Sequence, residues 1–277
     1  MATKQTFSVE GESPVRVHLT SATGRVRVIA NPGAEKTSVT VRTADVTGPS
    51  VDAVSGSTFH EVAGNNEKTL RIRVPHPMGA VRNAASGSTG GNVYNNTISG
   101  GTHFGTIIQR GSVDGVTLSG GQIALNDEKL ASSFTSSPSP ITVDVFLPQS
   151  SSFTLITTEA HLTTRGALKV LEVESVGGSV EADAVSIAFI HTTSGSVGVS
   201  SLQEEGDIST IDGDIRIDFY TGRNLGVRST NGGIRLAAAS GASGPVRLAT
   251  VSGDVVTRGI LHLDPTATSV SGEVRHQ

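Results

Sequence analysis

The chain has 277 residues, with 33 glycines, no cysteine, no tryptophan and a formal net charge of −4 at pH 7. This length is enough to bury a sizeable core, and the absence of cysteine excludes disulfide bonds and thiolate metal sites. The slightly acidic balance gives no electrostatic reason to expect nucleic-acid binding, which usually requires a strongly basic chain or patch. Abundant glycine with only 4% aromatic residues is typical of repeating β structure, where turns are frequent and stacked aliphatic residues form the core.

Residues 1–82 predict an N-terminal β region. They contain the alternating runs QTFSVEG, VRVHL, RVRVIA, TSVTVRTA and KTLRIRVP, and alternation of this kind is typical of half-buried strands. The stretches NPG, TGPS and GNN predict the turns between them. The first residues lack a secretory signal, and no segment approaches the roughly 18 apolar residues of a membrane-spanning helix. We therefore expect a cytoplasmic chain without membrane insertion, whose N-terminal strands continue into those of the C-terminal part.

Residues 83–126 form an insertion of different composition, rich in small and amide residues and poor in charge. One interpretation is a long glycine-rich loop or a few irregular coils. The stretch FGTIIQRGSVDGVTL supports another, because low charge, β-branched residues and the absence of proline favour a stackable cross-β segment. The candidate self-association residues are Phe104, Ile107, Ile108, Gln109, Gly111 and Val113.

Residues 127–277 form a β-repeat array in which each unit is built around a glycine. The pattern of STIDGDIRI returns along the array and once near the N-terminus, and successive units are 17–21 residues long. A hydroxyl residue stands three positions before each glycine, a β-branched residue stands two positions after it, and an aliphatic residue usually stands five before. The repeat glycines are Gly24, Gly178, Gly195, Gly213, Gly232, Gly253 and Gly272.

Each repeat position has a physical interpretation. We expect the glycine to occupy a sharp turn with positive φ, and the hydroxyl to bond to local backbone or to the neighbouring unit. The β-branched side chains are expected to point inward, because side chains alternate across a strand. A single short unit cannot bury its own apolar face, whereas stacked units can. The sequence therefore predicts an all-β fold: a parallel β-solenoid or β-helix-like stack, preceded by the N-terminal strands.

The outward positions of the units carry charge. In the C-terminal units an acidic residue follows the glycine and an arginine follows two residues later, which predicts an acidic column beside a basic one. The residues one and three positions after the glycine include Arg25 and Arg27, Asp214 and Arg216, and Glu273 and Arg275. Weak cross-strand pairs on a solvated face are one interpretation, and a polyanion-binding arginine stripe is the other.

The stretch DISTIDGDIRIDF, residues 207–219, concentrates four aspartates around Gly213. It satisfies neither the EF-hand pattern nor the repeat calcium motif. As a copy of the repeat, its isoleucines point inward, its aspartates point outward, and Asp214 is expected to pair with Arg216. A catalytic pair among Asp212, Asp214 and Asp218 stays open as an alternative.

No established catalytic or cofactor motif appears. The eight histidines show no close metal-ligand spacing, and the chain contains neither a nucleophile elbow nor a phosphate-binding P-loop. We therefore predict no catalytic residues, no bound metal and no cofactor.

Two resemblances extend these observations. The repeat pattern, together with VDVFLPQSSSFTLITT, resembles the bacterial putative adhesin family of glycine-rich β-repeat proteins over residues 140–277. The resemblance implies a β-solenoid-like fold and a non-enzymatic role. The insertion is similar to RIP-homotypic-type amyloid signalling motifs of actinobacterial proteins, which implies self-association or recruitment of a homotypic partner. The matching residues are Ile98, Ser99, Gly100, Gly101, Phe104, Gly105, Ile107, Ile108, Gln109, Gly111, Val113 and Gly115, with Arg110 where a small residue is commoner.

The sequence thus predicts a non-enzymatic binding or assembly protein that forms homo-oligomers or filaments, or that binds a homotypic protein partner. Two alternatives stay open: a surface adhesin that binds polysaccharide or protein, and a β-helix enzyme that acts on polysaccharide.

Overall fold

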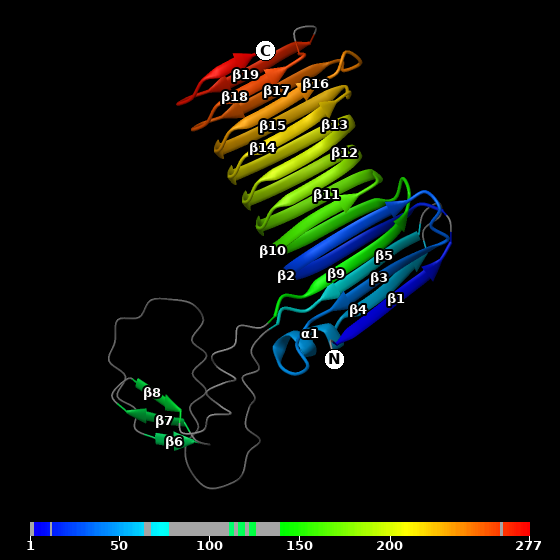
Figure 1. The fold of residues 1–277 in the computed structure, drawn as a ribbon, viewed down its shortest axis with the longest axis vertical. Helices are drawn as coiled ribbons and strands as arrows, with labels where there is room; N and C mark the ends of the chain where they lie inside the picture. Colours follow the sequence, from blue (N-terminus) through cyan, green and yellow to red (C-terminus); the bar gives the residue numbers. More distant parts are fainter. Residues whose placement is uncertain are drawn as a thin grey trace. The chain divides into compact units, whose positions relative to one another are not determined.

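The computed structural model describes residues 3–11, 13–63, 68–77, 111–113, 116–119, 122–125, 139–260 and 263–277. The chain divides into two compact units, one of residues 1–79 with 139–277 and one of residues 80–138. The described residues form strands throughout, with one short helix (Figure 1). The all-β prediction is confirmed.

The repeat-bearing strands of the first unit lie one above another, as Figure 1 shows from green to red. Each strand pairs in parallel with its equivalent in the next repeat, so that β13, β15, β17 and β19 form one ladder and β14, β16, β18 and β20 form a second. The strands are β10 (Ser152–Arg165), β11 (Ala167–Gly177), β12 (Val180–Ser194), β13 (Val197–Asp212), β14 (Ile215–Tyr220), β15 (Asn224–Asn231), β16 (Ile234–Ala238), β17 (Pro245–Thr250), β18 (Val255–Arg258), β19 (Asp264–Ser269) and β20 (Val274–His276).

The register joins equivalent positions of the repeat. Ile208 pairs with Val227, which pairs with Leu248, and the last of these pairs with Ala267. In the second ladder Ile215, Ile234, Val255 and Val274 follow one another in the same way. The β-branched position two residues after the glycine is at most 1% exposed in six units, and Val274 in the last is partly buried. The predicted inward direction of these side chains is confirmed.

The N-terminal strands extend the same sheet through β2 (Val15–Asn31). This long strand pairs in parallel with β10 along its length, with β5 (Lys68–Val74) through its first half, and with β9 (Thr142–Pro148) through its second half. Beyond these the pairing becomes antiparallel: β3 (Lys36–Arg42) pairs with β9, β1 (Lys4–Glu10) with β3, and β4 (Thr58–Ala63) with β5. The rings of Phe7 and Phe59 stack 5.2 Å apart between the edge strands β1 and β4.

A short helix, α1 (Pro49–Ser55), stands where the sequence predicted only a turn at TGPS. Its proline lies in the first turn, a position that tolerates the missing N–H group, and Ala53 and Val54 are buried. Seven residues are too few to show helical periodicity, so the helix depends on this packing rather than on a local signal.

Asp45 holds Ser139 at the point where the chain re-enters the first unit. Its carboxylate accepts hydrogen bonds from the Ser139 N–H at 2.9 Å and from the Ser139 hydroxyl at 2.5 Å, and Ser50 donates to the Ser139 carbonyl at 2.8 Å. The side-chain and backbone hydrogen bonds from Ser139 lower the pKa of Asp45. A lowered folded-state pKa means that this contribution to stability is present above the unfolded-state pKa and is lost as the pH falls through the folded value.

We expect Asp45→Ala to lower the free energy of unfolding by about 1–2 kcal/mol at pH 7, because two charge-assisted hydrogen bonds are lost. The difference from wild type should shrink as the pH falls below about 4, because the carboxyl of the unfolded chain protonates there while that of the folded chain protonates only at lower pH. Urea unfolding at pH 7 and at pH 3 measures it, with the exposed Glu35→Ala as the control. Equal destabilisation at both pH values would contradict a role for the carboxylate charge.

The second unit contains a small antiparallel sheet among its described residues. Strands β6 (Gly111–Val113), β7 (Val116–Ser119) and β8 (Gln122–Leu125) pair in sequence order.

Candidate functional site

Each of the seven repeat glycines packs against a backbone carbonyl of the adjacent level of the stack. A Cβ atom at Gly232 would lie 2.0 Å from the Gly213 oxygen, and one at Gly253 would lie 2.2 Å from the Gly232 oxygen. The same contact recurs at the other repeat glycines, with distances of 2.0–2.3 Å. The prediction that every repeat glycine needs positive φ is wrong, because only Gly24, Gly178 and Gly195 have it. The shared requirement is the close approach of two stacked backbones, which leaves no room for a side chain.

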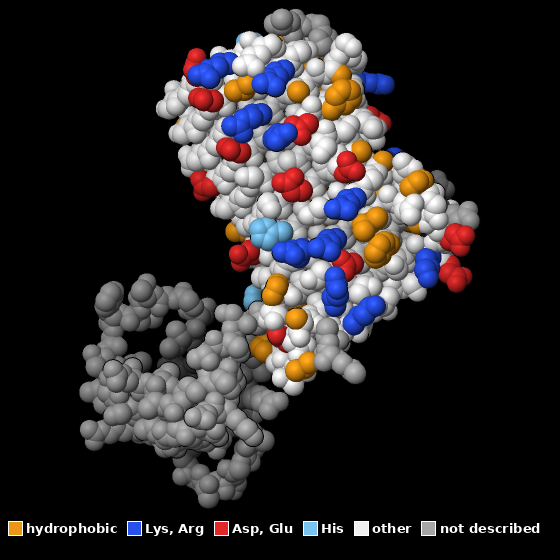
Figure 2. All heavy atoms as spheres, in the orientation of Figure 1, with side chains coloured by type: hydrophobic (Ala, Val, Ile, Leu, Met, Phe, Trp, Pro, Cys, Tyr) orange, Lys and Arg blue, Asp and Glu red, His pale blue; other side chains and the backbone are white. Residues whose placement is uncertain are grey.

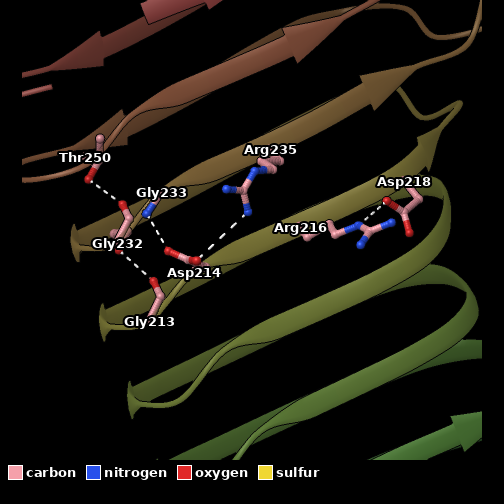
Figure 3. A network of polar contacts seen from close by, with 9 residues as sticks. Gly213, Asp214, Arg216, Asp218, Gly232, Gly233, Arg235 and Thr250 are labelled. Atoms are coloured by element: carbon pink, nitrogen blue, oxygen red, sulfur yellow. Dashed lines mark hydrogen bonds and ion pairs between the residues drawn. The ribbon is translucent and has the colours of Figure 1, made fainter. Parts of the chain in front are cut away.

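The hydroxyl position reinforces this contact from one unit to the next. In the C-terminal units Ser229 donates to the Gly213 oxygen at 3.1 Å, and Thr250 donates to the Gly232 oxygen at 2.9 Å (Figure 3). Ser21, in the first copy, instead donates to the Thr23 carbonyl in its own turn. Both predicted uses of the hydroxyl therefore occur, and both serve the turn or the stacking.

Three of the four aspartates of residues 207–219 are held by separate partners, whereas the buried Oδ1 of Asp207 has no hydrogen-bond partner among the described residues. Asp212 accepts from the Asn231 amide at 2.7 Å, and Asp214 accepts from the Gly233 N–H at 2.8 Å. The predicted pair between Asp214 and Arg216 is wrong. Arg216 donates to Asp218 at 2.5 Å, while the cation nearest Asp214 is Arg235 at 4.0 Å (Figure 3). The N–H group of the next unit fixes the Asp214 carboxylate, so Arg216 turns to the aspartate on its other side.

No group of three His, Asp or Glu side chains that could hold a metal ion occurs in the part of the chain that the structure describes. Tyr220 is fully buried, and desolvation raises its pKa to about 12. Its phenol therefore stays protonated at neutral pH, where it contributes to the core rather than to proton transfer.

A second group of arginines lies where β2 and β10 run side by side. Arg25, Arg27, Val28 and Ile29 from β2, with Thr163 and Arg165 from β10, line a surface groove of about 420 Å³, which we call the arginine groove. The pairing places Thr163 opposite Arg27 and Arg165 opposite Ile29. In Figure 2, basic side chains gather beside a group of hydrophobic ones in the middle of the face shown. The repeat pattern identifies Arg25 and Arg27 as outward residues of one copy, whereas nothing in the sequence connects Arg165 with them.

The candidate self-association residues fall mostly outside the described part of the chain. Gly111 and Val113 lie in β6, where Val113 pairs with Val116 of β7. Phe104, Ile107, Ile108 and Gln109 lie outside the described residues, so the cross-β interpretation stays a prediction.

The last described strands have partners on one side. Within the described ranges, β19 pairs only with β17 and β20 only with β18.

In the described part of the chain, no helix combines the length and the apolar character needed to cross a membrane.

These features define an all-β protein of stacked repeats, in which the recurring glycine and hydroxyl positions serve the turns and the stacking. The chain belongs to the Toastrack DUF4097 family, whose match spans residues 15–277. No curated protein matches the sequence.

Several solved structures resemble the chain, and two of them are described as putative adhesion proteins. A putative adhesin from Bacteroides fragilis NCTC 9343 is 11% identical, with a TM-score of 0.50, over 99% of this chain and 97% of that one. A putative cell adhesion protein from Clostridium sporogenes ATCC 15579 is 9% identical, with a TM-score of 0.37, over the whole of both chains. Because the Bacteroides fragilis protein is only 11% identical to this chain, the similarity shows a shared fold alone.

Proposed function

We propose that the protein is a non-enzymatic β-solenoid that acts as a binding and assembly module, and that it associates with a second copy of itself through its last repeat unit. The observation that carries this proposal is the one-sided pairing of β19 and β20, since the repeat strands before them pair on two sides. A strand edge of this kind presents unpaired N–H and C=O groups to another chain. A second copy offers the same edge, so the contact can close on itself around a twofold axis.

The polar chemistry of the repeat supports a role without catalysis. The outward carboxylates Asp212, Asp214 and Asp218 are each engaged by a neighbouring amide, N–H or guanidinium. This arrangement gives no support to the alternative of a polysaccharide-active enzyme. A surface adhesin is the second candidate, favoured by the description of the Bacteroides fragilis protein of the same fold. A cytoplasmic location stays a prediction from the sequence, and fractionation of cells that make the protein tests it.

We expect Ala267→Lys to abolish self-association while the chain remains folded. Ala267 lies on the inner side of β19 and packs against the core, and an inward charge on an edge strand opposes pairing. Thr268→Gln is the control, because it lengthens an exposed side chain of the same strand without adding a charge. Light scattering coupled to size exclusion, over a range of concentrations, gives the mass, and circular dichroism confirms the fold.

Wild type and Thr268→Gln should form dimers or larger assemblies, and Ala267→Lys should be monomeric. A wild-type monomer at every concentration, or an Ala267→Lys variant that associates like wild type, would overturn the proposed contact. Electron microscopy of a variant that lacks residues 83–126 separates the two possible sources of assembly. Filaments lost with this segment would assign assembly to the insertion rather than to β19.

A further inference from the structure

We propose that the arginine groove binds a phosphate-bearing ligand. Arg25 and Arg27 lie two positions apart, on the outer face of β2, and Arg165 projects from the adjoining strand β10. The Cα atoms of residues two positions apart on a strand are about 7 Å apart. Arginine side chains are long enough for their guanidinium groups to approach one another across that distance. Because guanidinium groups match the oxygens of phosphate in two-pronged hydrogen bonds, three of them around one hollow form an anion site.

The arginines of the groove differ from their equivalents in the C-terminal units. Arg216 is paired with Asp218, Arg275 with Glu273, and Arg235 lies 4.0 Å from Asp214. Among the described residues, no ion pair involves Arg25, Arg27 or Arg165. The cause lies in the repeat, because the position after the glycine is Arg25 in the first copy but acidic in units such as those of Asp214 and Glu273. The partner of Arg275, Glu273, is thus replaced by a second cation, Arg25. The partner of Arg216, Asp218, stands five positions after its glycine, where the first copy has Ile29.

The carboxylates around the groove are not paired with its arginines. Asp144, which pairs in register with Arg27, forms an ion pair with Arg42 at 3.0 Å. Asp183 accepts the Gly166 N–H at 2.9 Å, and Glu181 lies opposite Thr163 on the far side of β10. Among the described residues, none of these carboxylates forms an ion pair with Arg25, Arg27 or Arg165, in a chain whose overall charge is −4. A single carboxylate would balance one of them, whereas a phosphate monoester carries about −1.5 to −2 and a diphosphate carries more.

The groove also offers an apolar surface next to the cations. Ile29 lines it, and its register partner Phe146 on β9 is 43% exposed. This surface can receive the apolar or sugar part of a phosphorylated molecule. The larger hollow of about 670 Å³ on the other side of Phe146 is lined by Glu10 and Glu35 as well as Lys36, which makes it unsuited to an anion.

Isothermal titration of the full chain with inorganic pyrophosphate tests the site. We expect Arg25→Gln/Arg27→Gln to weaken binding by about tenfold or more, because each charge-assisted contact contributes substantially to affinity. Arg71→Gln/Arg73→Gln is the matched control. It removes two exposed arginines at the same spacing from β5, which pairs with the first half of β2, and it should change the affinity by less than about twofold.

Equal weakening in both variants, or unchanged binding in Arg25→Gln/Arg27→Gln, would overturn the site. Thermal unfolding followed by circular dichroism shows whether each variant is folded. Wild-type protein that binds neither pyrophosphate nor vesicles containing phosphatidic acid would overturn it as well.

Vesicles of phosphatidylcholine with and without phosphatidic acid distinguish the two sources of a phosphate group. If the ligand is a lipid headgroup, wild type should sediment with the phosphatidic-acid vesicles, and Phe146→Ser should reduce this without changing pyrophosphate affinity. Pyrophosphate binding without vesicle binding would support the site and assign it to a soluble phosphate ester. The site lies on β2 and β10, away from β19, so it is independent of self-association: a monomeric wild type can still bind phosphate.

Discussion

Gly232→Ala is expected to lower the free energy of unfolding by at least about 3 kcal/mol, a large effect for the addition of one methyl group. The new Cβ atom would lie 2.0 Å from the Gly213 carbonyl oxygen, which belongs to the backbone of the adjoining unit. Relief of that clash requires the two units to separate, which would also strain the parallel pairing of β14 with β16 and the hydrogen bond from Thr250 to the Gly232 carbonyl. Denaturant unfolding followed by circular dichroism measures the loss.

Gly233, the residue after Gly232, provides the control for this substitution. A Cβ atom at Gly233 would lie 3.4 Å from its nearest neighbour, the Asp254 carbonyl oxygen, which is an ordinary contact. We expect Gly233→Ala to change stability by less than about 1 kcal/mol. If the two alanine variants were equally stable, the close stacking of the repeat glycines would not be the reason for glycine at these positions.

Phe153→Ala is expected to cost about 3–5 kcal/mol, the range for truncation of a buried aromatic side chain. Phe153 is fully buried in β10, where it is flanked by Val17 of β2 on one side and Leu171 of β11 on the other. In a stack whose units contact mainly their neighbours, the cavity weakens both interfaces at once. Hydrogen exchange should therefore accelerate in β2 and β11 more than in β19.

Phe219→Ser is the control for Phe153→Ala, because Phe219 lies on β14 and its side chain is 51% exposed. Phe219→Ser should alter the free energy of unfolding by less than about 0.5 kcal/mol. Exchange rates that rise uniformly over the whole sheet in Phe153→Ala would indicate that the units unfold together and that the effect is not local.

The fold class and the direction of the core side chains could be predicted because every copy of the repeat carries the same pattern of residues. Ile215, Ile234 and Val255 occupy one position of the pattern, and a period-two alternation leaves them a single face to share. The helix α1 could not be predicted, since its seven residues are stabilised by the burial of Ala53 and Val54 rather than by periodicity.

The interactions between units were harder to predict than the units themselves. The partner of Asp214 is set by the Gly233 N–H of the next unit, which residue spacing within one copy does not reveal. The repeat pattern indicates that glycine is required, but the cause common to all seven positions is the short distance between two backbones rather than a positive φ. Arg165 joins Arg25 and Arg27 only through the register of β2 against β10, two strands more than 100 residues apart in sequence.

The spacing of the repeat glycines has a consequence for how such a chain can change in evolution. The interval from Gly213 to Gly232 is 19 residues and that from Gly232 to Gly253 is 21, yet the strands on either side keep their register. The extra length falls between β16 and β17, outside the paired strands. Duplication or loss of one complete unit would therefore lengthen or shorten the molecule by a single level and leave every other contact in place. A gain of half a unit would instead place inward and outward residues on the wrong faces, so such proteins are expected to differ in length by whole units.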